Sequence, residues 1–296
     1  MAATPATPTP TTLSPKVWLI TGCSSGLGRE LAIAALARGD HVIATARNAA
    51  KIDDLKQCGA QTIVVDVTSP DEVIHKSITD AINLYERVDI LVNNAGYGVV
   101  GGTDECSGKE IFDNFNTNVF GIFKVLRVVL PFMRVQQSGV IANIGSLAGR
   151  QSYPGLGVYS ATKFAVVGLT EALRGEVAHL GIEVTCIDLG LFRTSLDSNS
   201  VMAKKTIPES GPAVEFMKKT LGGGQQHGGD PAKAARVIVD ALTKSDSCAG
   251  QRSLPVRLAV GSDTFQFISG VLERDQKELQ EWTHLVSATD FDEVAK

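Results

Sequence analysis

The stretch Lys16-Val17-Trp18-Leu19-Ile20-Thr21-Gly22-Cys23-Ser24-Ser25-Gly26-Leu27-Gly28 decides the fold of this chain. Its first six residues are typical of a buried strand, and the helical run Leu27–Arg38 follows the glycines. Glycines in such a turn let the backbone approach a pyrophosphate, to which the helix N-terminus offers N–H groups and positive potential. An ordinary tight turn between a strand and a helix would look similar, so this loop indicates nucleotide binding only in combination with other residues.

The alternation of short strands and helices continues along the chain. Strands are predicted at 16–21, 41–45, 62–65, 89–92, 139–144, 182–187 and 256–260. Helices are predicted at 27–38, after the N-cap Ser69, at 108–135 with an interruption near Pro131, at 155–180, at 230–242 and, as a short helix, after 262. The pattern predicts one α/β domain built on a doubly wound parallel sheet of seven strands with helices on both faces. Ligands bind beyond the carboxyl ends of the strands in such sheets.

Composition narrows the class of protein. The 296 residues are 44% hydrophobic and 20% charged with a net charge of −4, and without a basic stripe a nucleic-acid partner is not expected. The five cysteines are widely spaced and form no CxxC pair, so we expect reduced thiols, no metal site and a cytoplasmic setting. No apolar run reaches the roughly 18–20 residues of a membrane span.

Three segments interrupt the regular pattern. Residues 1–15 are rich in Ala, Thr and Pro and are interpreted as a disordered extension rather than a signal peptide. Residues 16–285 form the expected catalytic domain, within which 195–229 is expected to be a flap ending in a glycine-rich stretch. Residues 286–296 form an acidic tail.

Tyr159 and Lys163 are spaced to lie one turn apart on one face of a helix. An isolated phenol has a pKa near ~10, and a fixed cation beside it lowers that value. A tyrosine poised in this way can exchange a proton with an alcohol or ketone oxygen. The same spacing also occurs in solvated surface helices, where the pair has no chemical role.

The residue after the second predicted strand bears on the choice of nucleotide. An acidic residue there would bind the adenosine ribose and repel a 2′-phosphate, but this chain has Thr45-Ala46-Arg47. Arg47 can pair with a phosphate, although it could also be an ordinary surface arginine. The missing acid favours NADP(H).

Further polar residues follow the predicted strands. Asp66 follows the third strand and could meet the adenine amino group, while Asn93-Asn94-Ala95-Gly96 follows the fourth and could equally be a turn. Ser146 follows the fifth strand and could bond a substrate oxygen. Asn118 lies within a helical run, where it is either a tolerated asparagine or a residue that holds a water near Lys163.

Together these motifs resemble the short-chain dehydrogenase/reductase family over about residues 16–260, which implies a Rossmann-type fold. They are Thr21-Gly22-x-x-x-Gly26-x-Gly28, Asn93-Asn94-Ala95-Gly96, Asn118, Ser146 and Tyr159-x-x-x-Lys163, in family order and spacing. Arg47 is similar to the NADP(H)-preferring pattern. The segment Phe192-Arg193-Thr194 and the Asp230-Pro231 helix resemble a fungal-type ketoreductase or 17β-hydroxysteroid-dehydrogenase-like branch.

The resemblance implies a role for each matching residue. Tyr159 would be the general acid/base, Lys163 would lower its pKa and hold the nicotinamide ribose, Ser146 would orient the substrate oxygen, and Asn118 would support a water relay. The implied cofactor-binding residues are Gly22, Ser24, Ser25, Gly26, Leu27, Gly28, Arg47, Asp66, Val67, Asn94, Ala95, Gly96, Tyr159, Lys163, Leu191, Phe192 and Thr194. A homodimer or homotetramer is also implied.

One residue departs from the family pattern. Leu189-Gly190 stands where the family usually has Pro-Gly after the sixth strand. Proline would stiffen this turn, whereas leucine either loosens it or presents an apolar side chain to the pocket. We hypothesise altered nicotinamide placement or substrate shape.

These expectations favour an NADP(H)-dependent enzyme that reduces a ketone or aldehyde, or oxidises the corresponding alcohol. The loop Tyr97–Thr103 and the flap would wall a pocket for a medium-sized, mostly apolar substrate. One alternative is the same scaffold without net redox turnover, as an isomerase, dehydratase or cyclase that uses the Tyr/Lys pair for proton transfer. Another is a regulatory nucleotide-binding protein, against which the intact Tyr159 and Lys163 argue.

Overall fold

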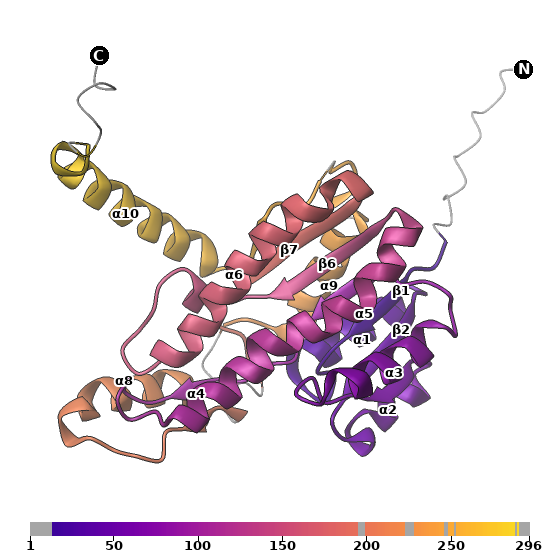
Figure 1. The fold of residues 1–296 in the computed structure, drawn as a ribbon, viewed down its shortest axis with the longest axis horizontal. Coiled ribbons are helices and arrows are strands. Elements are labelled where there is room, and N and C mark those ends of the chain that lie inside the picture. Colours follow the sequence, from indigo (N-terminus) through magenta and orange to yellow (C-terminus); the bar gives the residue numbers. More distant parts are fainter. Residues whose placement is uncertain are drawn as a thin grey trace, which may run out of the picture.

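A parallel sheet of seven strands forms the centre of the molecule (Figure 1). The computed structural model describes residues 14–194, 199–222, 228–245, 248–251, 253–287 and 289. In spatial order the strands are β3 (Gln61–Val64), β2 (His41–Ala46), β1 (Val17–Ile20), β4 (Ile90–Asn93), β6 (Gly139–Ile144), β7 (Ile182–Leu189) and β9 (Arg257–Val260). All the pairings are parallel. The predicted doubly wound α/β sheet is confirmed.

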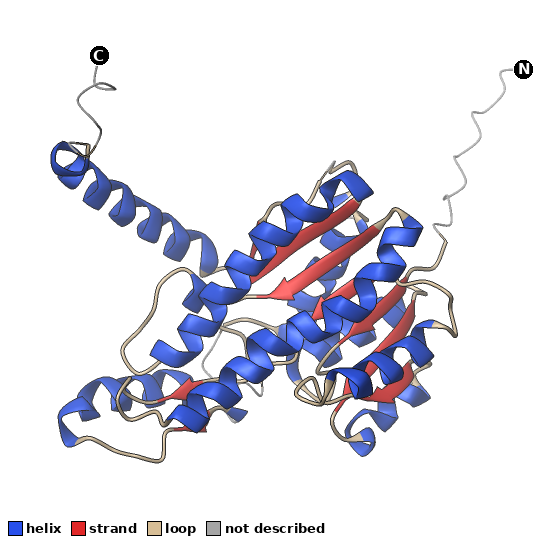
Figure 2. Cartoon of the chain, viewed as in Figure 1, coloured by secondary structure: helices blue, strands red, loops and turns tan. Residues whose placement is uncertain are grey.

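Helices cover both faces of this sheet (Figure 2). One core cluster joins the sheet to α1 (Gly26–Ala37) and α9 (Pro231–Thr243), which pack against each other. A second cluster joins the opposite face to α3 (Asp71–Ile82), α5 (Gly121–Gln136) and α6 (Gly157–Val177). Strands buried on both faces explain why β1 and β4 are almost continuously apolar in sequence.

Short elements fill the connections. The turn η1 (Ala49–Ile52) and helix α2 (Asp53–Gln57) follow β2, while η3 (Leu147–Gly149), η4 (Ala178–Leu180) and η5 (Pro208–Ser210) are single 3-10 turns. A small second sheet pairs β5 (Val99–Val100) with β8 (Val201–Met202), and α8 (Gly211–Gly222) follows it. These last elements lie with α4 (Gly108–Phe115) beyond the carboxyl end of β6 (Figure 1).

Some predicted helices differ in the structure. The run 108–135 is divided into α4, a π-helical turn η2 (Asn116–Phe120) and α5, and α5 continues through Pro131 instead of stopping there. Pro131 is exposed, so water can satisfy the carbonyl that loses its helical partner. Helix α3 begins at Asp71 with Pro70 as its N-cap, one residue later than the predicted cap at Ser69.

The last helix is longer than predicted. Instead of a short helix, α10 (Thr264–Val286) has 23 residues and projects away from the sheet (Figure 1). Within it Thr264 and Val271 are buried, while large apolar side chains such as Leu279 and Trp282 are exposed. The predicted disordered extension 1–15 and acidic tail 286–296 lie almost wholly outside the described residues, as do parts of the predicted flap 195–229.

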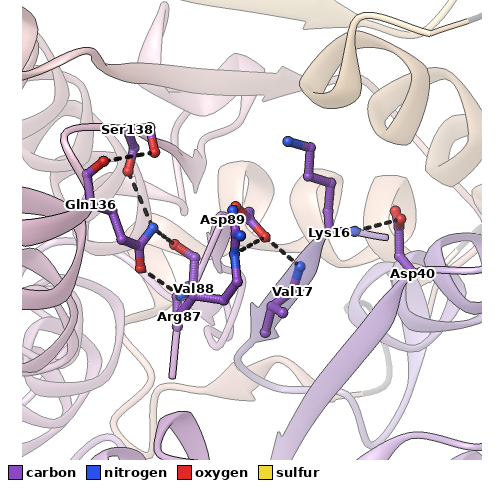
Figure 3. A network of polar contacts seen from close by, with 8 residues as sticks. All are labelled: Lys16, Val17, Asp40, Arg87, Val88, Asp89, Gln136 and Ser138. Carbon is purple, nitrogen blue, oxygen red and sulfur yellow. Dashed lines mark hydrogen bonds and ion pairs between the residues drawn. The ribbon is translucent and has the colours of Figure 1, made fainter. Parts of the chain in front are cut away.

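Carboxylates close the amino ends of the central strands (Figure 3). Asp89 accepts from the backbone N–H of Val17 at 2.8 Å and forms an ion pair with Arg87, and Asp40 accepts from the Lys16 N–H at 2.9 Å. The Gln136 side chain ties α5 to β4 by bonding both backbone groups of Val88. These buried acids therefore stabilise the edge opposite to the one where ligands bind in such sheets.

Two searches of the described residues bear on other functions. None of their helices combines the length and the apolar character that crossing a membrane requires. No group of three or more His, Cys, Asp or Glu among them is placed to hold a metal ion.

Candidate active site

The glycine loop between β1 and α1 is held in shape by Asn94. Gly22 and Gly26 have positive φ angles of 75° and 58°, which glycine adopts without strain. A Cβ on Gly28 would overlap the amide nitrogen of Asn94 and lie 2.6 Å from the Gly22 carbonyl oxygen. The Asn94 amide in turn donates to the carbonyls of Thr21 and Gly22 at 2.9 and 3.1 Å. The glycines are thus required by the fold of the loop itself.

Thr21 links this loop to the turn after β4. Its hydroxyl oxygen accepts from the N–H groups of Asn94 and Ala95, both at 3.0 Å. Thr21 belongs to the glycine motif, but no role could be predicted for its side chain, because threonine at the end of a strand is also common for its β propensity. The contacts bring Gly22, Asn94 and Ala95 together at the carboxyl ends of two neighbouring strands.

A buried amide chain braces the centre of the sheet beneath this site. Asn93 on β4 donates to Asn143 on β6 at 2.8 Å, and Asn143 donates to Thr170 on α6 at 2.9 Å. Asn143 and Thr170 are fully buried. Hydrogen bonds between fully buried groups favour one arrangement strongly. These bonds therefore fix α6, which carries Tyr159 and Lys163, relative to β4.

Arg47 and Asp66 follow neighbouring strands at the same end of the sheet. Arg47 is exposed, and the described residues offer it no hydrogen-bond or ion-pair partner. Asp66 closes a local turn, because its Oδ1 accepts from both the N–H and the hydroxyl of Thr68 at 2.9 and 2.7 Å. Val67 is buried against Gly121, where an added Cβ would lie 2.8 Å from Val67 Cγ2.

Tyr159 and Lys163 lie together on α6 and are both buried to 7% exposure. The Lys163 ammonium lies 5.6 Å from the centroid of the Tyr159 ring and donates to the carbonyl of Ile144, at the end of β6, at 2.7 Å. Ser146 follows that strand end and caps the turn η3, accepting from the Ala148 N–H at 3.1 Å. The three side chains therefore converge where β6 meets α6.

Burial changes the acidity of this pair in a way that its spacing did not predict. Desolvation raises the pKa of Tyr159 to about 12, partly offset by a hydrogen bond with Ser146. Desolvation also lowers the pKa of Lys163 to about 8. The shift of the Tyr159 pKa is thus opposite to the expected lowering: the phenol is protonated at neutral pH, and as a weaker acid it needs positive charge nearby to release that proton.

Asn118 is fixed by three hydrogen bonds inside the π-helical turn. Its side-chain oxygen accepts from the Tyr97 N–H at 3.0 Å, and its amide donates to the Tyr97 carbonyl at 3.0 Å and to Thr162 at 3.1 Å. Thr162 is the neighbour of Lys163. Asn118 therefore has partners on two other segments, while its role in holding a water near Lys163 stays a prediction. π-helical turns of this kind are frequent at functional sites.

A buried ion cluster lies beside the site and was not found from the sequence. Asp188 on β7 is fully buried, accepts from Arg150 at 2.9 Å, and binds Arg257 through both of its oxygens at 2.8 and 2.9 Å. Arg257 also donates to the carbonyl of Gly149, in the turn that Ser146 caps. Asp188 is 38 positions from Arg150 and 69 positions from Arg257, so no local pattern could reveal the cluster.

The segment after β7 contacts the N-terminal end of α10. Leu189 continues the strand by pairing with Val260, and its side chain packs against the core cluster beneath the sheet. Leu189 therefore does not simply loosen this turn. Leu191 donates its N–H to Asp263 at 3.0 Å, and Phe192 forms a parallel bridge with Gly229. These contacts place Leu191, Phe192 and Thr194 close to the end of β7.

The comparisons with known proteins agree with this geometry. The family model described as short chain dehydrogenase matches residues 16–205, which is well over half of the chain. The chain is a short-chain dehydrogenase/reductase. Oxidoreductase BOA17 of Botryotinia fuckeliana is 32% identical to this short-chain dehydrogenase/reductase over 283 residues, covering 93% of it and 99% of the relative. A 3-ketodihydrosphingosine reductase of Bacteroides thetaiotaomicron is 32% identical over 240 residues, covering 79% and 86%.

Several solved structures are also similar to this short-chain dehydrogenase/reductase. A short-chain dehydrogenase from Streptomyces avermitilis is 40% identical with a TM-score of 0.85, covering 94% of this chain and 99% of that one. An enzyme from Burkholderia phymatum in complex with NAD is 25% identical with a TM-score of 0.74, covering 90% and 95%. ElxO, solved with NADP bound, is 25% identical with a TM-score of 0.68, covering 85% and 99%. The chain is therefore an oxidoreductase of this family.

The residues at the carboxyl ends of the strands suit a dinucleotide. The first turn of α1 offers N–H groups without intrahelical partners and contains no acidic residue. Gly22 and Gly26 expose the backbone at this point, and Arg47 supplies a cation without a protein partner in the described part of the chain. This set of donors fits a pyrophosphate and a further phosphate.

Proposed function

We propose that this enzyme is an NADP(H)-dependent reductase of a ketone or aldehyde in a medium-sized, mostly apolar metabolite. The observation that carries the proposal is the burial of Tyr159 beside Ser146 and Lys163. A protonated phenol at the end of a parallel sheet can donate to a carbonyl oxygen, which is the step that reduction requires. The oxidation of the alcohol is the reverse of the same step.

Four residues would have separate roles in the proposed reduction. The nicotinamide cofactor supplies the hydride when bound. Ser146 bonds the carbonyl oxygen of the substrate, and Tyr159 gives that oxygen its proton as negative charge develops on it. Lys163 holds positive charge near the phenol and stabilises the phenolate that remains. Asn118 fixes the loop at Tyr97 and the α6 turn at Thr162, so that Lys163 keeps its place.

The cofactor would lie along the ends of β1 to β4 and β7. In this proposal Gly22, Ser24, Ser25, Gly26, Leu27 and Gly28 hold the pyrophosphate, and Arg47 holds a 2′-phosphate. Asp66, Val67, Asn94, Ala95 and Gly96 surround the adenosine. Leu191, Phe192 and Thr194 hold the nicotinamide end.

Two observations support an apolar substrate. Tyr159 belongs to a cluster of apolar side chains formed by Val100, Ala148, Leu156, Val214 and Met217. The relative from Bacteroides thetaiotaomicron is named a 3-ketodihydrosphingosine reductase, and the substrate in that name is a ketone. A ketone attached to an apolar chain or ring system is accordingly the class of substrate that we propose.

A panel of apolar ketones and aldehydes assayed with NADPH and NADH in parallel tests this proposal. We expect turnover of at least one substrate and a preference for NADPH. In Arg47→Asp that preference should fall by about tenfold or more, because a charge-assisted hydrogen bond is worth on the order of 1.5–3 kcal/mol. An Arg47→Asp enzyme that keeps the full preference would remove the basis for NADP(H).

A further inference from the structure

The described part of the flap, residues 199–222, is joined to the loop after β4 by main-chain pairing. Strand β8 lies parallel to β5, with the N–H of Val201 donating to the Gly98 carbonyl and that of Ala203 to the Val100 carbonyl, both at 2.8 Å. A Cβ on Gly101 would overlap the Cβ of Ala203, so the close approach of the two segments needs a glycine there. A strand pairing of only two residues on each side is marginally stable by itself, so other contacts must stabilise it.

Two buried carboxylates supply such contacts, and each joins the loop to the flap. Glu105 is 3% exposed; one of its oxygens accepts from the Ile207 N–H on the flap and the other from the Gly102 N–H, both at 2.7 Å. Glu110 is 9% exposed; its Oε1 accepts from the Lys204 N–H at 3.0 Å and its Oε2 from the Ser107 N–H at 2.8 Å. Each side chain thus has one oxygen bonded to the segment 102–107 before α4 and one bonded to the flap.

Both carboxylates are charged in this arrangement. The N–H of Ile207 is the main cause that holds the pKa of Glu105 below its usual range, and the hydroxyl of Ser107 is the main cause for Glu110. Hydrogen bonds to charged acceptors are stronger than those between neutral groups, and a buried carboxylate without partners is costly. The contacts of both acids with the flap therefore resist its opening.

The fastened flap covers the proton donor. Helix α8 follows β8 in the flap, and its buried side chains Val214 and Met217 join Val100 and Leu156 in the cluster that contains Tyr159. Their membership of the same apolar cluster as Tyr159 places Val214 and Met217 near the site.

We propose that Glu105 and Glu110 are positioning residues that fasten the flap over the site, and that Val214 and Met217 select the apolar part of the substrate. The role of Val214 and Met217 in substrate choice rests on the proposed carbonyl reductase function. The fastening by the two glutamates does not, because it follows from contacts within the chain. The two parts can therefore be tested separately.

Hydrogen exchange of the flap, followed by mass spectrometry in Glu105→Gln, Glu110→Gln and the double variant, tests the fastening. A glutamine has one acceptor oxygen, so it cannot accept on both the loop and the flap. We expect exchange of residues 200–207 to accelerate by about tenfold or more, the effect of losing one hydrogen bond to a charged group. Exchange in β6 should not change. Asp113→Asn, on α4 but paired only with the exposed Lys109, is the matched control and should behave as the unmodified enzyme.

The kinetics of the same proteins test the consequence for the substrate. We expect the double variant to raise KM for an apolar ketone by about tenfold with a smaller change in kcat, because Tyr159, Ser146 and Lys163 are left in place. Met217→Ala should shift the preference toward bulkier ketones. Unchanged exchange at 200–207 in both single variants, or equal acceleration in Asp113→Asn, overturns the fastening. Faster exchange with unchanged KM and substrate preference overturns the role in selection.

A failure of the proposed function can be distinguished from a failure of the proposed fastening. If no carbonyl substrate is reduced by the unmodified enzyme, the function fails while the exchange experiment still decides whether the glutamates fasten the flap. If the double variant does not fold, the two single variants carry the same test.

Discussion

The side chains at the centre of the site show how burial controls proton transfer. The Lys163 ammonium is buried, bonded to the Ile144 carbonyl and close to the Tyr159 ring. Its lowered pKa of about 8 means that it carries its charge below that pH and loses it above. The raised pKa of Tyr159, about 12, keeps the phenol protonated over the same range. The proposed reduction should therefore depend on the charge of Lys163 at alkaline pH.

This dependence predicts the pH profile of carbonyl reduction. We expect kcat/KM to be level at neutral pH and to fall above about pH 8, as Lys163 loses the charge that stabilises the developing phenolate. Arginine stays protonated throughout this range, so Lys163→Arg should move the fall to higher pH, although at lower overall activity. An unmoved break near pH 8 in the Lys163→Arg enzyme would show that another group controls it.

Gly28 lies where the neighbouring atoms of the protein leave no room for a Cβ atom. We expect Gly28→Ala to lower the free energy of unfolding by about 1–3 kcal/mol, because its Cβ would overlap the Asn94 amide nitrogen and press on the Gly22 carbonyl. Chemical denaturation measures this change. Nucleotide affinity should fall as well.

Gly168 is the matched control for that substitution. It lies within α6 with nothing within 4 Å of an added Cβ, so Gly168→Ala should raise the free energy of unfolding by about 0.5–1 kcal/mol. Equal effects at Gly28 and Gly168 would show that crowding at Asn94 does not govern the loop.

At the scale of elements, the sequence located most strands and helices and missed how some of them end. Local patterns place β1 to β4, β6, β7 and β9 within a residue or two, since each of these strands is a short apolar run next to a turn. They did not reveal the π-helical turn at Asn118, because its cause is a set of bonds to Tyr97 and Thr162 on other elements. The same reason hid the pairing of β5 with β8, which involves two residues on each side.

For the candidate site, the sequence predicts where residues lie better than it predicts their acidity. The positions of Gly22, Asn94, Ser146, Tyr159 and Lys163 followed from strand order, because carboxyl ends of neighbouring parallel strands meet at one edge. The direction of the Tyr159 pKa shift did not follow, since it depends on burial by distant segments such as α8. Spacing along a helix gives the partner of a side chain and leaves its solvation undetermined.

At the scale of the whole molecule, the two ends of the sheet have different functions. The amino ends are closed by Asp40 and Asp89 with their backbone partners, and these acids stabilise the fold. The carboxyl ends carry the glycine loop, Arg47, Tyr159 and the fastened flap. In the proposed reaction, Tyr159 gives its proton to the substrate at this second end of the sheet.

The measurement that tests this claim most directly is NADPH oxidation by Tyr159→Phe with a ketone that the unmodified enzyme reduces. Phenylalanine keeps the ring in its apolar cluster with Val100, Leu156 and Met217 and removes only the hydroxyl. We predict that turnover falls by about 10²- to 10⁴-fold, the usual contribution of a general acid, while the affinity for NADPH is kept. A Tyr159→Phe enzyme that binds NADPH and reduces the ketone at the full rate would contradict the account.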